Sequence, residues 1–230
     1  MRRIALCFLF ALAACTKPAS APEAPKDLTT AAIPVDAPVI LAFGDSLYAG
    51  YRLAPGEGYP PRLEAALNAG GVKARVVNAG VSGDTTAAAL ARLTFTLDGQ
   101  KVKPALVLVG LGGNDMLRGL PPAQTRANLD AILTELGKRQ IPALLTGMLA
   151  APNMGKDYVS AFNPIYPALA KKHKAPLVPF FLQAVIGNDL LMLEDHIHPN
   201  AQGIEKIVAA TRDEVARALA AATSIRKSSP

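Results

Sequence analysis

The sequence predicts an α/β domain in which a five-stranded parallel sheet lies between two layers of helices. Two observations support this. Five short apolar runs, each bounded by Gly or Pro, are typical of strands buried on both faces of a sheet. A helical stretch follows each run. Strand–helix alternation repeated in this way favours parallel strands joined by right-handed crossovers.

The predicted elements follow one another in regular order. The strands are expected at residues 39–43, 74–77, 105–109, 143–145 and 177–180. The helices are expected at residues 61–69, 85–97, 123–139, 158–172 and 202–222. In the third helix Ala127, Ile132 and Leu136 recur near helical spacing. Because such sheets bind ligands beyond the carboxyl ends of their strands, functional residues are expected in the segments that follow the strands.

The composition fits one globular domain and excludes several other classes. The chain has 230 residues, of which 50% are hydrophobic and 18% charged, so it has enough apolar residues for a core and bulk disorder is excluded. Its net charge of +6 includes one dense basic cluster, Lys171-Lys172-His173-Lys174, without interleaved aromatic residues. We interpret this cluster as the solvated end of a helix, and nucleic acid is not an expected partner. The domain is predicted over residues 37–223, with a polar tail at 224–230.

The amino-terminal residues have the pattern of an export signal. Two arginines precede an unbroken apolar run, residues 4–14, which is shorter than the about 20 residues that a membrane span needs. The run ends in Leu12-Ala13-Ala14-Cys15, which resembles the lipobox of bacterial lipoproteins; an ordinary secretory signal is the alternative. We therefore predict a lipoprotein signal peptide at 1–14, lipidation of Cys15 and a flexible tether over 15–36. The expected location is the bacterial cell envelope, at the periplasmic face of the outer membrane.

Four polar segments lie where the predicted strands end or the last helix begins. They are GDSLY at 44–48, NAGVSGDTT at 78–86, GLGGND at 110–115 and EDHIHPN at 194–200. Each segment alone is also typical of a turn or a helix cap. The two closely spaced histidines and one aspartate of the last segment suggest a metal site only weakly, because no further ligand site accompanies them.

In this order, the four segments resemble the conserved blocks of the SGNH (GDSL-type) hydrolases, in the bacterial thioesterase I/lysophospholipase L1 and arylesterase branch. The resemblance extends from about Val39 to Ala220, and two further phrases fit it, RGLPP at 118–122 and NMGKDY at 153–158. It implies a flavodoxin-like three-layer fold and an ester hydrolase that needs no cofactor or metal.

The residue types support a nucleophilic mechanism. A serine hydroxyl needs an adjacent base to remove its proton, and Ser46 at a strand-to-helix turn places its oxygen at the rim of the sheet. His198 is the matching base. Asp195, three residues earlier, is close enough to orient the imidazole. His196 is the competing histidine, but next to Asp195 it is expected to point away and to be a structural or rim residue.

The resemblance also assigns the groups that stabilise the oxyanion, and residue type and position suggest those that bind the acyl group. The oxyanion donors are the backbone amides of Ser46 and Gly83 and the side-chain amide of Asn114. Asp45 is expected near the substrate, with a capping or loop-fixing role rather than a catalytic one. Apolar walls for the acyl group are expected in the loops after the third and fourth strands, from Leu117, Leu120, Met148, Met154 and Phe162.

The expected function is hydrolysis of aryl, short-to-medium acyl or lysophospholipid-like esters through an acyl-enzyme. One alternative is a carbohydrate or peptidoglycan O-acetylesterase, and another is a non-catalytic envelope lipoprotein that binds lipid or glycan in the same cleft. The expected partners are a small ester or lipid substrate and the membrane that holds the anchor, and the protein is expected to be a monomer.

Overall fold

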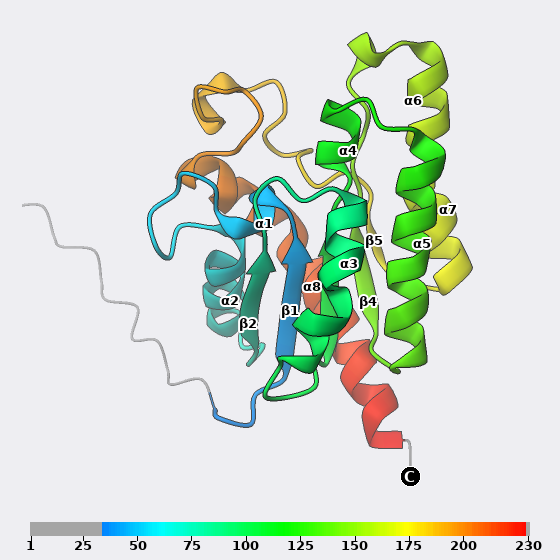
Figure 1. Cartoon of the computed structure of the whole chain (residues 1–230). Coiled ribbons are helices and arrows are strands. Elements are labelled where there is room, and N and C mark those ends of the chain that lie inside the picture. Colours follow the sequence, from blue (N-terminus) through cyan, green and yellow to red (C-terminus); the bar gives the residue numbers. More distant parts are fainter. Residues whose placement is uncertain (1–33, 229–230) are drawn as a thin grey trace, which may run out of the picture.

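The computed structural model describes residues 34–228, and its centre is a five-stranded parallel sheet in the order β2-β1-β3-β4-β5 (Figure 1). This order and the layered architecture confirm the predicted fold class. The strands are β1 (Val39–Gly44), β2 (Arg75–Gly80), β3 (Leu106–Gly110), β4 (Ala143–Thr146) and β5 (Leu177–Val178). The principal helices are α1 (Ser46–Ala49), α2 (Tyr59–Ala69), α3 (Thr86–Asp98), α4 (Gly113–Leu117), α5 (Pro122–Lys138), α6 (Lys156–Phe162), α7 (Ile165–His173) and α8 (Ala201–Ser228).

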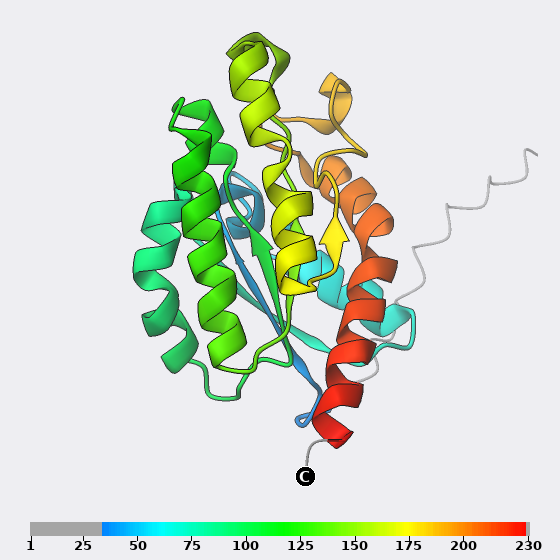
Figure 2. The ribbon, with the colours of Figure 1, turned by 90° about the vertical axis from the view of Figure 1, so that its right-hand side faces the viewer.

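Helices cover both faces of the sheet. The helices α3, α5 and α7 pack on one face, whereas α2 and α8 pack against each other on the opposite face (Figures 1 and 2). The inner strands β1 and β3 are almost entirely buried between these layers. All five strands point the same way, so the loops at their carboxyl ends gather at one end of the molecule. In Figure 1 this is the upper end, where α1, α4 and the segment before α8 lie.

Several elements differ from the sequence prediction. The helices α1 and α4 are not among the predicted helices, and β5 ends at Val178 rather than at residue 180. The strand β2 is an edge strand, and Val77 is 37% exposed, so this run is not buried on both faces. The helix predicted over 158–172 is two helices, α6 and α7, which meet at Asn163 and Pro164; proline has no amide hydrogen with which to continue α6. The last helix continues to Ser228 and so includes the first residues of the predicted tail.

The amino-terminal predictions concern residues outside the described part of the chain. The signal peptide, Cys15 and nearly all of the tether precede residue 34 and lie outside the described residues. Within the described part of the chain, no helix is long and apolar enough to cross a membrane.

Candidate active site

The nucleophile candidate is the first residue of a one-turn helix, α1, that begins directly beyond β1. Asp45 caps this helix, because its Oδ1 accepts a hydrogen bond of 3.0 Å from the Leu47 amide. Ser46 is thereby held at a positive helix start, as the sequence predicts. Ser46 is only 7% exposed, so its hydroxyl lies beneath the surrounding loops rather than on an open loop.

A row of glycines makes room for α1. Gly44, Gly80 and Gly110 end three adjacent strands and stand in register beside one another. A Cβ on Gly80 would lie 2.4 Å from the Ala49 nitrogen, and one on Gly110 would lie 2.5 Å from the Tyr48 ring. Only glycine lets α1 pack this closely on the strand ends. The sequence reasoning did not assign this role to the glycines, although each of three apolar strands ends in one.

His198 and Asp195 come from the segment between β5 and α8, more than 140 residues further along the chain. His198 Nε2 lies 2.8 Å from Ser46 Oγ, and His198 Nδ1 lies 2.7 Å from Asp195 Oδ2. These two distances place Ser46, His198 and Asp195 in one hydrogen-bonded chain in the order that a catalytic triad requires. The predicted triad residues are therefore brought together by the fold.

The carboxylate of Asp195 stays ionised beside the imidazole. Its Oδ1 accepts hydrogen bonds of 2.9 Å from the amides of Ile197 and His198. Burial by itself raises the pKa of Asp195, but these backbone hydrogen bonds and the imidazole outweigh it and bring the pKa to about 2. Asp195 is consequently negative at any pH at which the imidazole is an effective base.

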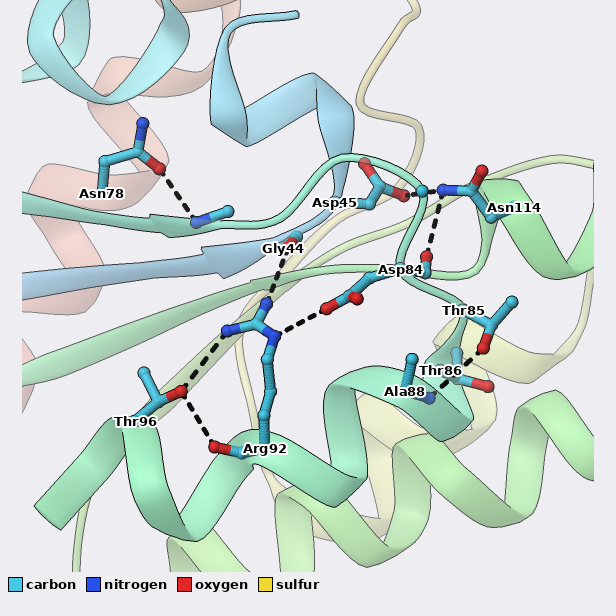
Figure 3. A network of polar contacts seen from close by, with 12 residues as sticks. Gly44, Asp45, Asn78, Asp84, Thr85, Thr86, Ala88, Arg92, Thr96 and Asn114 are labelled. Carbon is cyan, nitrogen blue, oxygen red and sulfur yellow. Dashed lines mark hydrogen bonds and ion pairs between the residues drawn. The ribbon is translucent and has the colours of Figure 1, made fainter. Parts of the chain in front are cut away.

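The predicted oxyanion donors lie on the segments that follow β1, β2 and β3. Asn114 Nδ2 donates to the Asp84 carbonyl at 3.0 Å and lies 3.5 Å from Asp45 Oδ2, so its side chain is fixed between two of the site loops (Figure 3). Gly83 adopts a left-handed φ of +86°. Among residues 34–228, no backbone oxygen accepts a hydrogen bond from the amides of Ser46 or Gly83. Both amides are thus available to a substrate oxygen.

A partly buried ion pair lies beneath this group of segments. Arg92 Nε lies 2.6 Å from Asp84 Oδ2, and Arg92 Nη2 donates to the Gly44 carbonyl at 3.0 Å (Figure 3). The guanidinium carbon is also 4.3 Å from the centre of the Phe43 ring. Arg92 therefore ties the end of β1 to the loop that presents Gly83.

Three carboxyl groups are buried close together under the rim, and one of them is strongly perturbed. Burial raises the pKa of Asp45 to about 7. The nearby charges of Asp84 and Asp115 add to this rise. Arg92 pairs with Asp84, and Asp115 accepts hydrogen bonds from Thr86 and Thr125. Asp45 is the least compensated of the three.

The predicted substrate-binding residues divide into two groups. Leu117 is 51% exposed, and Leu120 and Met154 are half-buried, on the segments that follow β3 and β4. The other three residues are buried, so their side chains are not exposed at the rim. Phe162 is fully buried between the Tyr158 and Tyr166 rings.

Met148 and Asp45 are also inside the protein. Met148 is 6% exposed and packs beneath Gly113, whose Cβ position would be 3.7 Å from the methionine methyl carbon. Asp45 is 2% exposed and uses its carboxylate to cap α1. Elements distant in the sequence determine whether such side chains are buried. The local sequence does not, because an apolar side chain in a loop can point inward or outward equally well.

The remaining histidines are outside the site. His196 has a positive φ of +55° and points to Asp189, 3.1 Å from Nδ1 to Oδ1, as expected for a rim residue. His173 is not a freely solvated residue: it is half-buried, with Nε2 2.6 Å from Asp130 Oδ1. Within residues 34–228, no three His, Cys, Asp or Glu side chains are grouped closely enough to hold a metal ion.

The site as a whole has the parts of an acyl-transfer centre. It contains a serine on a helix start, an imidazole within hydrogen-bond distance and an ionised carboxylate behind it, with the predicted oxyanion donors on the neighbouring segments. Such a set at the carboxyl edge of a three-layer α/β/α sheet defines a serine hydrolase. Gly-Asp-Ser here follows the first strand and lacks the second glycine of the nucleophile elbow, which separates it from the α/β-hydrolases.

Comparison with known proteins assigns the family. The sequence model of the GDSL-like lipase/acylhydrolase family matches residues 42–206. Esterase TesA of Pseudomonas aeruginosa is 43% identical over 163 residues, which cover 71% of this chain and 80% of the relative. Thioesterase 1/protease 1/lysophospholipase L1 of Escherichia coli is 42% identical over 164 residues, or 71% of this chain and 76% of the relative.

A solved structure agrees with these sequence relatives. The SGNH-hydrolase family esterase AlinE4 is 58% identical, with a TM-score of 0.69, over 80% of this chain and 97% of its own. This chain belongs to the GDSL-like lipase/acylhydrolase family, the SGNH hydrolases, and is a carboxylic ester hydrolase. The predicted family is confirmed.

Proposed function

We propose that this protein is a serine esterase that cleaves esters with aryl or short-to-medium acyl groups, including lysophospholipid-like esters. The observation that carries the proposal is the continuous hydrogen-bonded chain from Ser46 through His198 to Asp195, with distances of 2.8 and 2.7 Å. The names of the similar proteins, which include esterases and a lysophospholipase, support the same class of substrate.

The geometry accounts for both half-reactions. Ser46 Oγ attacks the ester carbonyl carbon while its proton moves to His198 Nε2, and the carbonyl oxygen becomes an oxyanion held by the three donors. When the intermediate collapses, the same proton passes to the departing alkoxide or phenoxide, which leaves as the alcohol, and an ester of Ser46 remains. Water then repeats the sequence: His198 takes its proton, the acyl–Oγ bond breaks, and the carboxylic acid is released as Ser46 regains the proton.

Apolar side chains at the rim favour an apolar acyl group over an acetylated sugar. Leu117 and Leu149 are 51% and 40% exposed, on the segments that follow β3 and β4. Tyr158 in α6 donates a hydrogen bond of 2.9 Å to the Leu120 carbonyl and so joins these two segments. An acyl chain lying over them would cover leucine surface, and each buried methylene contributes roughly 0.8 kcal/mol.

A series of p-nitrophenyl esters tests this proposal directly. The purified protein in detergent is assayed on acetyl, butyryl, octanoyl and dodecanoyl esters, beside Ser46→Ala and the matched control Ser160→Ala, whose hydroxyl lies exposed on α6. We expect hydrolysis that reaches beyond butyryl, that Ser160→Ala retains and that Ser46→Ala loses. Activity confined to acetyl esters would favour the O-acetylesterase alternative. Equal inertness of wild type and Ser46→Ala would favour the binding-protein alternative.

We further propose that the protein acts as a monomer anchored by lipid at Cys15 to the cell envelope, on the periplasmic face of the outer membrane. The lipobox-like Leu12-Ala13-Ala14-Cys15 supports this location. Membrane fractionation of cells carrying wild type or Cys15→Ser tests it: the wild type should stay with the membranes. A processed Cys15→Ser protein that also stays there would contradict the anchor.

A further inference from the structure

The turn after α1 places an aromatic ring against the face of the imidazole. The centres of the Tyr51 and His198 rings are 4.4 Å apart, and the ring planes are tilted by 38°. Ser46, Tyr51 and His198 line the same small hollow. The contact joins residues far apart in the sequence, and neither the mechanism above nor the sequence motifs use Tyr51.

The nucleophile and this ring belong to one rigid turn. The Tyr51 amide donates to the Ser46 carbonyl at 3.2 Å, and Gly50 closes α1 in the left-handed conformation, with φ of +81°. Arg52, the residue after Tyr51, also has a positive φ of +57°, which is unusual for a residue other than glycine. A residue other than glycine keeps a positive φ only where the surrounding structure holds it in that conformation. The turn that presents Oγ therefore fixes the ring as well.

The two known hydrogen bonds of the imidazole leave its faces without support. Contacts from Nδ1 to Asp195 and from Nε2 to Ser46 lie at the edge of the ring. Both permit the ring to rock about the line that joins the two partners. A ring stacked on one face removes that freedom. An aromatic face also attracts a cation within about 6 Å, and the imidazole becomes a cation when it accepts the serine proton.

We propose that Tyr51 is a positioning residue for the general base: its ring holds the plane of the His198 imidazole and stabilises the imidazolium formed as Ser46 loses its proton. This inference rests on the proposed function, because the imidazolium forms during ester cleavage. The proton moves from Oγ to Nε2 while the bond between Oγ and the carbonyl carbon forms, and Tyr51 itself exchanges no proton or electron.

Two charged groups bear on the same imidazole. Asp195, on the segment that carries His198, favours the imidazolium through its 2.7 Å contact. Arg52 disfavours it, since its guanidinium carbon lies 5.3 Å from the centre of the Tyr51 ring. The other residues that line the hollow, Leu47, Gly50, Leu53, Pro199 and Ile204, carry no charge. The Asp195 contact does not involve the ring, whereas Arg52, which lies over the ring, loses that contact in Tyr51→Leu and keeps it in Tyr51→Phe.

The first test is kinetic and uses two substitutions of one side chain. Tyr51→Leu is expected to lower kcat on a p-nitrophenyl ester roughly 5- to 20-fold with KM within about twofold, and to move the acid limb of the kcat/KM profile to lower pH by about half a unit or more. Tyr51→Phe keeps the ring and should restore most of the activity and the wild-type profile. Phe95→Leu, which removes an exposed ring at the far end of α3, is the matched control.

The second test does not depend on activity. The chain contains three histidines, so NMR titration of the full-length protein in detergent follows His198 with His173 and His196 as internal references. The titration midpoint of His198 should fall in Tyr51→Leu while the two reference midpoints stay. Fluorinated phenylalanine at position 51 keeps the shape of the ring and weakens its negative face, so the midpoint should fall with each added fluorine.

The outcomes separate the two proposals. A Tyr51→Leu protein with the wild-type midpoint and acid limb overturns the positioning role, and so does a Tyr51→Phe protein that loses as much activity as Tyr51→Leu. If Tyr51→Leu does not fold, an unchanged His198 midpoint across the fluorinated series overturns it. Wild-type protein that cleaves no ester, or as much as Ser46→Ala, overturns the proposed function, while the titration still decides the contact with Tyr51.

Discussion

The two halves of the active site are built in different ways. The nucleophile half, residues 44–48 with the loops 78–86 and 110–115, lies over buried polar groups that contact one another across three strands. The base loop, residues 193–200, is more exposed. It is held by bonds within itself, such as those that Asp195 accepts from the amides of Ile197 and His198, and by bonds to the neighbouring residues 189–192. The first half depends on the core of the domain, whereas the second is a local structure placed on its rim.

This difference has a consequence for substitutions. A substitution in the base loop removes a catalytic group but few buried contacts, so it should leave the fold intact. A change under the nucleophile half leaves a buried charge or donor without its partner, which costs stability as well as activity. Activity and stability are thus expected to separate in one half and to fall together in the other.

The largest expected effect is in the base loop. Asp195→Asn removes the charge that stabilises the imidazolium and permits the wrong tautomer, so kcat should fall roughly 1,000- to 10,000-fold. The melting temperature should stay within about 2 °C of wild type, because the side chain is half-buried and the loss is local. Ester hydrolysis and circular dichroism melting of the purified protein measure the two quantities.

His196→Asn is the matched control for this substitution. His196 lies beside Asp195, its side chain is 67% exposed, and asparagine tolerates its positive φ of +55°. Activity should be within about twofold of wild type. A loss comparable to that of Asp195→Asn would show that the loop as a whole, rather than the Asp195–His198 pair, controls catalysis.

The next effect is in the nucleophile half. Arg92→Ala leaves Asp84 without its partner and removes the hydrogen bond to the Gly44 carbonyl, so the free energy of unfolding should fall by about 2–4 kcal/mol. The kcat of the remaining folded protein should fall too, since the Asp84 carbonyl orients Asn114. Urea denaturation and active-site titration of the same samples measure both.

An exposed ion pair is the control for Arg92. Arg217 in α8 pairs with Glu214, with the arginine side chain 69% exposed, and Arg217→Ala should shift the melting temperature by less than about 2 °C. If Arg92→Ala were no more destabilising than Arg217→Ala, the two halves of the site would not differ as we infer.

The smallest of these effects is a pH dependence of stability. The pKa of Asp45 is raised to about 7 in the folded protein from an ordinary 3.8, so the folded state binds this proton more tightly than the unfolded state. The stability from the protonated group is present below about pH 4 and is lost as the pH rises through 7. Asp45→Asn has no such proton to lose.

Denaturation of wild type and Asp45→Asn near pH 5 and near pH 8 tests this sign. The free energy of unfolding of wild type relative to the variant should be about 2–3 kcal/mol lower at the higher pH. Asp195 does not change the stability between pH 5 and pH 8, because its pKa is lowered to about 2. The stability that its ionised carboxylate contributes is lost only in strong acid, where the carboxylate becomes protonated. An equal difference at both pH values would mean that Asp45 is ionised in the fold without cost.

Much of the site follows from the sequence because its strongest signals are local or repeated. Alternating apolar runs and helices determine a parallel sheet, and a parallel sheet places every post-strand segment at one edge. Ser46, Gly83 and Asn114 each lie in the segment that follows a strand, so the topology places all three segments at the same edge of the sheet. Asp195 and His198 are three residues apart and pair within their own loop.

The tertiary structure alone decided what depends on contacts between distant segments. Phe162 and Met148 are as apolar as Leu117, but α5 to α7 and the sheet cover the first two and leave the third exposed. The raised pKa of Asp45 depends first on its burial and then on carboxylates from two other loops. The ring of Tyr51 meets His198 only because the turn after α1 and the segment before α8 fold together. Local sequence preference sets which element forms; burial and cross-chain contact are properties of the assembled layers, and only the assembled layers determine them.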